Sequence, residues 1–228
     1  LAPPERSHVI VNGLDAARVA GAAMTREAAR RSLQLEPEAL VIGTVARFDP
    51  VKALDVLLRA FTIVATAQPD ARLVLLGEGP EASRLRSFAV ALGIEARVRF
   101  PGFIAGASRL LPAFDLYASA SRKEGLPLAF LEAMACGLAI AATRVPGHMD
   151  VVEQGVTGLL VASDDPRALG RAMRDLLAEP AGRSAMGQAG RQRIENRFAA
   201  SRMAAATADL YRSVAGRFAG GRVLNRGV

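Results

Sequence analysis

The 228-residue chain has no tryptophan and a single cysteine, Cys136. One cysteine excludes an internal disulfide and fits a reducing compartment, and its apolar surroundings indicate packing rather than a nucleophile. No apolar run approaches the ~20 residues of a membrane span, and the first residues lack the apolar core of a signal peptide. We therefore expect a soluble, cytoplasmic protein.

Several sequence patterns that define common site chemistries are also missing. The chain has no Walker A sequence, no Cys/His spacing that would hold a metal, and no G-x-S-x-G nucleophile elbow. These absences argue against P-loop nucleotide hydrolysis, zinc chemistry and a serine hydrolase. We expect no metal and no cofactor.

Lysine is scarce, since only Lys52 and Lys123 occur, yet the formal net charge is +7. From Leu169 onward eleven arginines stand against four acidic residues, so the rest of the chain is balanced. Two interpretations stay open for this basic end: peripheral contact with an anionic membrane surface, or a solvated helix face. Nucleic acid is not an expected partner, because no aromatic residues interleave with the arginines to stack on bases.

Apolar runs of strand length alternate with helical patterns from residue 40 onward. Strands are predicted over 40–46, 72–76, 98–100 and 138–142, with another ending at residue 161, and a helix over 54–67. The first strand is almost continuously apolar, as expected where a sheet is covered on both faces. The pattern predicts an α/β fold, a Rossmann-like doubly wound parallel sheet whose ligands bind at the carboxyl ends of the strands.

The segments before and after this alternation do not continue the strand–helix pattern. Residues 9–11 form an apolar run that predicts a strand entering a turn, and 16–37 indicate a linker with one short helix. After Pro166, three helical segments are separated at Pro180 and near Asn196, and the chain from Gly220 onward is expected to fray.

The most informative stretch runs from residue 119 to 137. Gly125 offers a turn without steric cost, Pro127 suits the first helical position, and Gly137 suits the helix stop. A turn from a strand into a helix points free backbone N–H groups and the positive end of the helix dipole at one place. An anion is expected there.

Two glutamates bracket this place. Glu124 precedes the turn, and Glu132 lies in the helix, where long side chains lean toward the N-terminus. Carboxylates only accept hydrogen bonds, so they suit the hydroxyls of a ribose or a sugar. From the residues alone, two solvated glutamates remain the alternative.

Two cations follow the first predicted strand. Arg47 can clamp a phosphate through two hydrogen bonds, whereas Lys52 acts as a point charge. Both stand at the carboxyl end of a strand, where the ligand is expected. The alternative here is two surface cations.

The spacing of Glu124 and Glu132, with Ala133 to Gly137 after the second, resembles the E-x7-E motif of the retaining glycosyltransferases of family 4, also called group 1. These enzymes have the GT-B fold: two Rossmann-like domains, of which the C-terminal one holds the nucleotide-sugar donor. The resemblance implies that Glu124 contacts the donor sugar and Glu132 the ribose hydroxyls. It also implies that Arg47 and Lys52 bind the donor diphosphate and, with the helix N-terminus, stabilise it as it departs.

The resemblance adds further residues to the expected donor site. Gly77 begins a loop that approaches the donor, and Gly102 and Phe103 lie in the turn where the family reads the base, largely through backbone groups. The remaining ones follow Glu124, namely Gly125, Leu126, Pro127 and Leu128.

The chain departs from the family pattern at two places. Lys52 is followed by Ala53 where the family has glycine, which questions the backbone path of that loop. Residues 143–150 replace a Gly-Gly-x-Pro-Glu loop, so that Asp150 stands for the glutamate and the identity of the sugar is open. His148 in this segment is expected to be a loop residue and not a catalyst.

A dinucleotide-binding enzyme is a rival interpretation, because the loop from Gly77 to Ala82 fits G-x-G-x-x-A. That fingerprint also requires an acidic residue about 20 positions on, at the end of the next strand. Glu95 lies before that strand instead. A dehydrogenase is therefore not expected.

The resemblance also divides the chain. Residues 1–38 are expected to be an interdomain segment with a remnant of an N-terminal domain, because residues 12–15 resemble the family's domain junction. Residues 39–200 form the nucleotide-sugar-binding domain, and 201–228 a helix with a frayed tail. A chain that starts in an apolar strand without methionine suggests a fragment that lacks its acceptor-binding domain.

The expected function is transfer of a sugar from a nucleoside diphosphate sugar, UDP being favoured over GDP, to an acceptor that these residues do not identify. The fragment alone is expected to be inactive. Two alternatives stay open: another GT-B enzyme, such as a nucleotide-sugar epimerase or a phosphorylase, and a sugar-nucleotide-binding module without catalysis.

Overall fold

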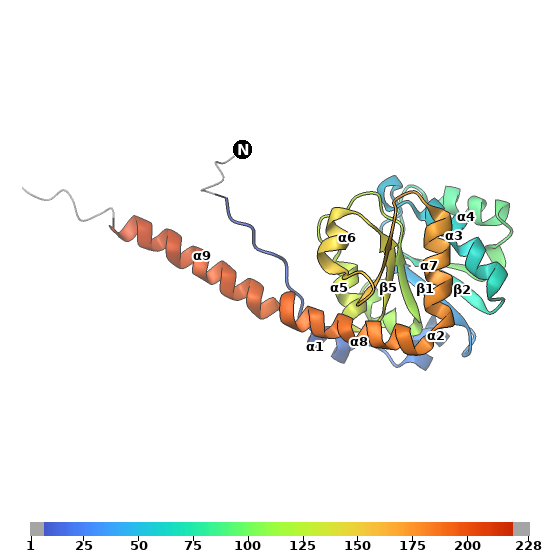
Figure 1. Cartoon of the computed structure of the whole chain (residues 1–228), viewed down its shortest axis with the longest axis horizontal. Helices are drawn as coiled ribbons and strands as arrows, with labels where there is room; N and C mark the ends of the chain where they lie inside the picture. Colours follow the sequence, from blue (N-terminus) through green and yellow to red (C-terminus); the bar gives the residue numbers. More distant parts are fainter. Residues whose placement is uncertain (1–6, 221–228) are drawn as a thin grey trace, which may run out of the picture.

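The computed structural model describes residues 7–220 as a parallel sheet covered by helices on both faces, with the last helix leaving the body (Figure 1). Each pair of neighbouring strands is parallel, and the order is β3-β2-β1-β4-β5-β6. The strands are β1 Leu40–Val45, β2 Ala71–Leu76, β3 Val98–Gly102, β4 Leu116–Ser119, β5 Ile140–Thr143 and β6 Gly158–Val161. The predicted Rossmann-like sheet is confirmed.

The sheet has its topological switch point between β1 and β4. The chain runs outward from β1 through β2 to β3, then returns to the other side of β1 and continues through β5 to β6. Helices that follow β1 and β4 therefore leave toward opposite faces, and a crevice opens at the carboxyl ends of these two strands. This is the edge at which the sequence places Arg47 and Glu124.

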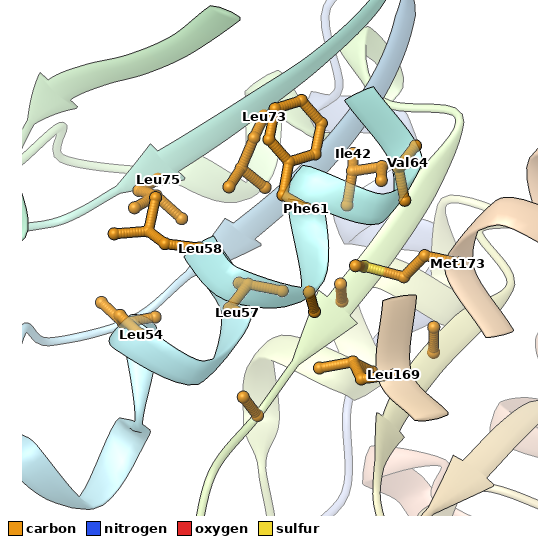
Figure 2. Packing of buried hydrophobic residues seen from close by; sticks show 14 of the residues in the cluster. Ile42, Leu54, Leu57, Leu58, Phe61, Val64, Leu73, Leu75, Leu169 and Met173 are labelled. Atoms are coloured by element: carbon orange, nitrogen blue, oxygen red, sulfur yellow. The ribbon is translucent and has the colours of Figure 1, made fainter. Parts of the chain in front are cut away.

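Helices on each face of the sheet enclose a separate hydrophobic core. The first core is covered by α3 Leu54–Ala67, α4 Ala82–Ala91 and α7 Pro166–Ala178. In Figure 2, Phe61 and Val64 of α3 point toward Leu73 and Ile42 of the sheet, with Met173 of α7 beside them. The second core is covered by α2 Arg26–Ser32, α5 Leu128–Ala135, α6 Pro146–Val151 and α8 Pro180–Arg197.

Short 3-10 helices lie in the connections, and two further helices lie near the chain ends. The 3-10 helices are η2 Pro50–Lys52, η3 Glu95–Arg97 and η4 Ala107–Ala113. The outer helices are α1 Ala16–Ala22 and α9 Ala200–Gly220. The predicted break at Pro180 is confirmed, and the one expected near Asn196 falls at Phe198 and Ala199.

The strand predicted over residues 9–11 is wrong. The structure shows no regular element there, and Val9 is 93% exposed. An apolar run becomes a strand only where a partner strand accepts its hydrogen bonds, and here only Leu14 forms an isolated bridge, with Ala199. The single helix expected within 16–37 is two helices, because Thr25 caps a new one by accepting from the amide of Ala28. The fraying expected beyond Gly220 lies outside the described residues.

Helix α5 begins one residue later than predicted. Pro127 has an extended backbone with ψ 96° and is the N-cap, so Glu132 is the fifth helical residue. The predicted end is confirmed, since Gly137 takes the left-handed conformation at φ 78°. Cys136 precedes it, and burial raises the pKa of its thiol to about 11, so that a nucleophilic thiolate is disfavoured at neutral pH.

The end of the sheet opposite the crevice is tied to α2 through a buried carboxylate. Asp115 accepts from the backbone N–H of Val41 over 2.8 Å and from the guanidinium of Arg30 over 2.9 Å. Arg30 also donates to the carbonyl oxygens of Ala113 and Pro37. Burial lowers the pKa of Arg30, although Asp115 acts in the opposite direction. The pair fixes α2 against the sheet.

Replacing Asp115 with asparagine should lower the free energy of unfolding by about 2 kcal/mol, because a buried guanidinium then loses its anionic partner. The measurement is urea denaturation of the 228-residue chain. Asp175→Asn is the matched control, since Asp175 pairs with Arg174 at a site where both side chains are exposed and should change stability by less than about 0.5 kcal/mol. Equal effects from the two substitutions would contradict the prediction.

Candidate functional site

A cavity of about 670 Å³ opens at the carboxyl ends of β1 and β2, beside the switch point. Its volume lies within the range of small-molecule sites. Arg47 and Glu132 stand in its wall, and apolar residues from the ends of the strands and from the segment before η4 form most of the rest. Its lining is Val45, Ala46, Arg47, Leu76, Gly77, Glu78, Gly79, Phe103, Ile104, Gly106, Ala107, Ser108 and Glu132.

Of the three charged residues in this lining, Arg47, Glu78 and Glu132, the two predicted as site residues are available to a ligand in different ways. The side chain of Arg47 is 72% exposed and forms an ion pair with Asp49 over 3.1 Å. Glu132 is half-buried on α5, and burial raises the pKa of its carboxyl group. An ionised carboxylate only accepts hydrogen bonds and has two oxygens, so Glu132 is suited to bind a diol.

Lys52 and Glu124, in the segments that follow β1 and β4, form an ion pair. The Nζ atom of Lys52 lies 2.6 Å from Oε1 of Glu124, and both side chains are largely buried. Ser121 donates its hydroxyl hydrogen to the same carboxylate oxygen over 2.7 Å. The structure thus brings together two predicted site residues that lie 72 positions apart in the sequence.

Hydrogen bonds to backbone groups join the loop that carries Lys52 to the loop that carries Glu124. The N–H group of Arg122 donates to the carbonyl of Val51 over 2.8 Å, and its guanidinium donates to the carbonyl of Pro50 over 2.8 Å. Ala53 then adopts the left-handed conformation at φ 49°, which glycine takes at no steric cost. Alanine at this position therefore adds backbone strain, but the loop still forms its turn.

The N-terminus of α5 is open toward the same region. No side chain caps this helix, and its N-cap is Pro127, which is buried. Uncapped N–H groups at the start of a helix attract an anion. This uncapped helix start, between Glu124 and Glu132 along the chain, is the place where the sequence predicts an anion.

A second cavity, of about 600 Å³, lies at the loop before α5. Its wall includes Glu124, Gly125 and Leu126 from the loop before α5, and Gly147 and Asp150 from α6. The carbonyl of Gly125 packs so closely on Gly147 that a Cβ atom at position 147 would lie 1.8 Å from its oxygen. By contrast, a Cβ atom at Gly125 would meet nothing within 4 Å.

The predicted site residues thus divide between two cavities. Arg47, Gly77, Phe103 and Glu132 line the first, and Glu124, Gly125 and Leu126 line the second. The other predicted residues, Lys52, Gly102, Pro127 and Leu128, are in the walls of neither. Lys52 is nevertheless joined to the second cavity through its ion pair with Glu124, and the carbonyl of Gly102 accepts from the N–H of Gly77 over 3.0 Å.

The expectation that His148 is a loop residue is wrong. Pro146 begins the helix α6, and His148 on that helix is fully buried. Sequence reasoning also missed Ser121 and Ser119, which connect His148 to Glu124. The S-x-x-E spacing from Ser121 to Glu124 is that of a capping box, but no helix begins there, and the two side chains are hydrogen-bonded directly to each other.

Within residues 7–220, no group of three or more histidine, cysteine or acidic side chains is placed to hold a metal ion. In the same part of the chain, no helix has the length and apolar character needed to cross a membrane.

Comparison with known proteins places this geometry in a family. Residues 25–193 match the family model described as glycosyl transferases group 1. The chain is 37% identical over 225 residues to D-inositol 3-phosphate glycosyltransferase of Salinispora tropica, with 92% of this chain and 46% of the relative covered. It is 36% identical over 207 residues to the enzyme of that name from Rhodococcus opacus, with 86% and 45% covered. The chain therefore spans about half the length of these curated relatives.

Solved structures agree with this placement. HepE of Anabaena, solved with UDP and glucose, superimposes with a TM-score of 0.85 at 25% identity over 92% of this chain and 58% of that one. Sucrose-phosphate synthase of Thermosynechococcus elongatus gives a TM-score of 0.81 at 28% identity, with 92% and 53% covered. From its family model, its relatives and its fold, the chain belongs to the group 1 glycosyl transferases.

Proposed function

We propose that the chain is the donor-binding half of a retaining glycosyltransferase of family 4, which transfers a sugar from a UDP-sugar to an acceptor. The observation that carries this proposal is the set of charges around the switch point: Arg47 and Glu132 in one cavity, and the Lys52–Glu124 pair in the segments after β1 and β4. UDP is favoured as the nucleotide because HepE, whose solved structure is similar to this chain, was solved with UDP and with UDP-glucose.

Lys52 and Glu124 suit the two groups that are joined by the bond that would break, a phosphate and a sugar. In a nucleotide sugar, the anionic phosphate and the hydroxyl-bearing sugar are joined through one oxygen atom. Lys52 can contact the phosphate while Glu124, 2.6 Å away, accepts hydrogen bonds from hydroxyls of the sugar. As the bond breaks, negative charge grows on the diphosphate, and Lys52, Arg47 and the open N-terminus of α5 would stabilise it.

The nucleoside would then occupy the first cavity. Its apolar wall with the exposed Phe103 suits a base, and Glu132 would accept hydrogen bonds from the ribose hydroxyls. The base itself would be recognised through the segment from Gly102 to Ile104. Gly77 lies where the loop after β2 closes this cavity.

We further propose that a second Rossmann-like domain supplies the acceptor site. The support is that the chain covers about half of each of these relatives and that the proposed sugar position faces the second cavity. Residues 1–38 would then be an interdomain segment and 39–200 the donor domain, and 201–228 would form a helix with a tail.

Titration calorimetry with UDP and GDP tests the proposal on the 228-residue chain, together with a sugar-transfer assay that uses the full-length enzyme as control. We expect binding of UDP, weaker binding of GDP, and no transfer by the chain alone. Failure to bind any nucleotide would overturn the donor site, and full transfer by the chain alone would overturn the two-domain proposal.

Glu132→Gln should weaken UDP binding more than tenfold, because hydrogen bonds to a charged acceptor contribute about 1.5–3 kcal/mol. The substitution keeps the shape of the side chain and removes the charge. Free pyrophosphate lacks a ribose, so its affinity should not change, and calorimetry with both ligands measures the difference. Equal loss for UDP and pyrophosphate would assign Glu132 a structural role.

A further inference from the structure

His148 lies in the protein interior directly behind the loop that carries Glu124. Its imidazole stacks on the ring of Phe130, with centroids 4.5 Å apart and planes inclined by 18°. The helix that carries it meets the loop, because Gly147 packs on the carbonyl of Gly125. A buried polar ring needs hydrogen-bond partners, and those of His148 lead toward the candidate site.

The contacts of His148 determine which nitrogen carries the hydrogen. Nδ1 lies 2.7 Å from the backbone oxygen of Thr143, and a carbonyl oxygen only accepts, so Nδ1 is the donor. Burial lowers the pKa of His148, which favours the neutral ring; Glu124 raises this pKa and Lys52 lowers it. In the neutral ring Nε2 is an acceptor, and it faces the hydroxyl of Ser119 at 3.5 Å.

Two buried serine hydroxyls connect this nitrogen to Glu124. The Oγ atoms of Ser119 and Ser121 lie 3.2 Å apart, and Ser121 donates to Glu124 over 2.7 Å. Because a carboxylate only accepts, the one hydroxyl hydrogen of Ser121 is committed to Glu124. Ser121 therefore has no hydrogen left for Ser119, and the one hydroxyl hydrogen of Ser119 can go to Nε2 of His148. Ser119 in turn accepts from the backbone N–H of Ser121 over 3.4 Å, so that His148 orients Ser119 and Ser119 holds the residue whose hydroxyl meets Glu124.

We propose that His148 is a positioning residue for Glu124. By donating to Thr143 and accepting from Ser119, the imidazole fixes the hydroxyls on which the carboxylate rests, so that Glu124 stays where it meets the donor sugar. This inference rests on the proposed function. It assigns a role to a residue that touches no substrate, and a small displacement of a group at the reaction centre can cost about 10²-fold in rate.

The connection can be tested on the 228-residue chain by imidazole ¹⁵N spectroscopy, without a transfer assay. The chain has two histidines, His8 and His148, so His148→Asn identifies the signals of the buried ring. We expect that ring to carry its hydrogen on Nδ1, and we expect its Nε2 signal to move in Ser119→Ala. A hydrogen on Nε2, or an Nε2 signal that does not respond to Ser119→Ala, overturns the proposal.

The consequence for the donor is tested by calorimetry with UDP and UDP-glucose. Ser119→Ala and His148→Asn should each weaken UDP-glucose binding about fivefold and leave UDP binding unchanged. The double variant should bind no more weakly than the weaker single variant, since both act through one connection. Equal losses for UDP and UDP-glucose, or additive losses in the double variant, would show a structural role and overturn the proposal.

Glu124→Gln separates this inference from the function on which it rests. If Glu124→Gln leaves UDP-glucose binding unchanged, Glu124 does not hold the sugar, and the proposed function fails together with the inference. If Glu124→Gln weakens UDP-glucose binding but Ser119→Ala and His148→Asn do not, only the role of His148 is overturned.

Discussion

Lys52→Ala and Arg47→Ala should each lower the turnover of the full-length enzyme about 10²- to 10³-fold, as loss of a charge-stabilising donor does elsewhere. The reason is that, in the proposed reaction, negative charge grows on the departing diphosphate and the two cations would stabilise it. Lys52 has a second role, because its removal leaves the largely buried Glu124 without its cation. The measurement is the steady-state rate at saturating UDP-sugar.

Lys123→Ala is the matched control, since Lys123 is the other lysine of the chain, lies next to Glu124 in the sequence, and is exposed. Its removal changes the net charge as much as Lys52→Ala does and should leave turnover near wild type. A loss in Lys123→Ala as large as that in Lys52→Ala would indicate a general charge effect. Wild-type rates in both Lys52→Ala and Arg47→Ala would exclude the two cations from the site.

Much of the sheet could be predicted from the sequence because β1, β2 and β5 are buried on both faces. Such strands are continuous apolar runs, and the helical segments between them are long enough for the crossovers that parallel pairing needs. The helix over 54–67 has the bounds that its apolar periodicity indicates. The strand predicted from the apolar run at 9–11 is wrong because composition does not show whether a partner strand is present.

The candidate site could be predicted as a set of residues but not as an arrangement. Motif spacing identifies Glu124 and Glu132, and the position after a strand identifies Arg47 and Lys52. The direct pairing of Lys52 with Glu124 joins two loops that are far apart in the sequence, and no spacing rule encodes that distance. His148 was missed because its partners, Ser119 and Thr143, end neighbouring strands β4 and β5 and meet it only through the fold.

Two glycines near Glu124, Gly125 and Gly147, differ in whether their positions could hold a side chain. The sequence places the need for glycine at Gly125, but the backbone there does not lie in the left-handed region, and a Cβ atom would have open space. At Gly147 a Cβ atom would lie 1.8 Å from the carbonyl oxygen of Gly125 and 2.8 Å from that of Glu124. The steric requirement therefore belongs to α6, and the loop of Glu124 rests on it.

Gly147→Ala should lower the free energy of unfolding by about 3 kcal/mol, because the new methyl group meets backbone atoms that have no alternative rotamer. It should also lower turnover at least 10²-fold, since relief of the clash displaces the loop that holds Glu124. Urea denaturation and steady-state kinetics measure the two effects. Gly125→Ala is the neighbouring control and should change stability by less than about 1 kcal/mol, as alanine at an unstrained position does. If Gly147→Ala is as stable and as active as wild type, α6 does not support the loop, and the close contact between Gly147 and Gly125 has no role in holding Glu124.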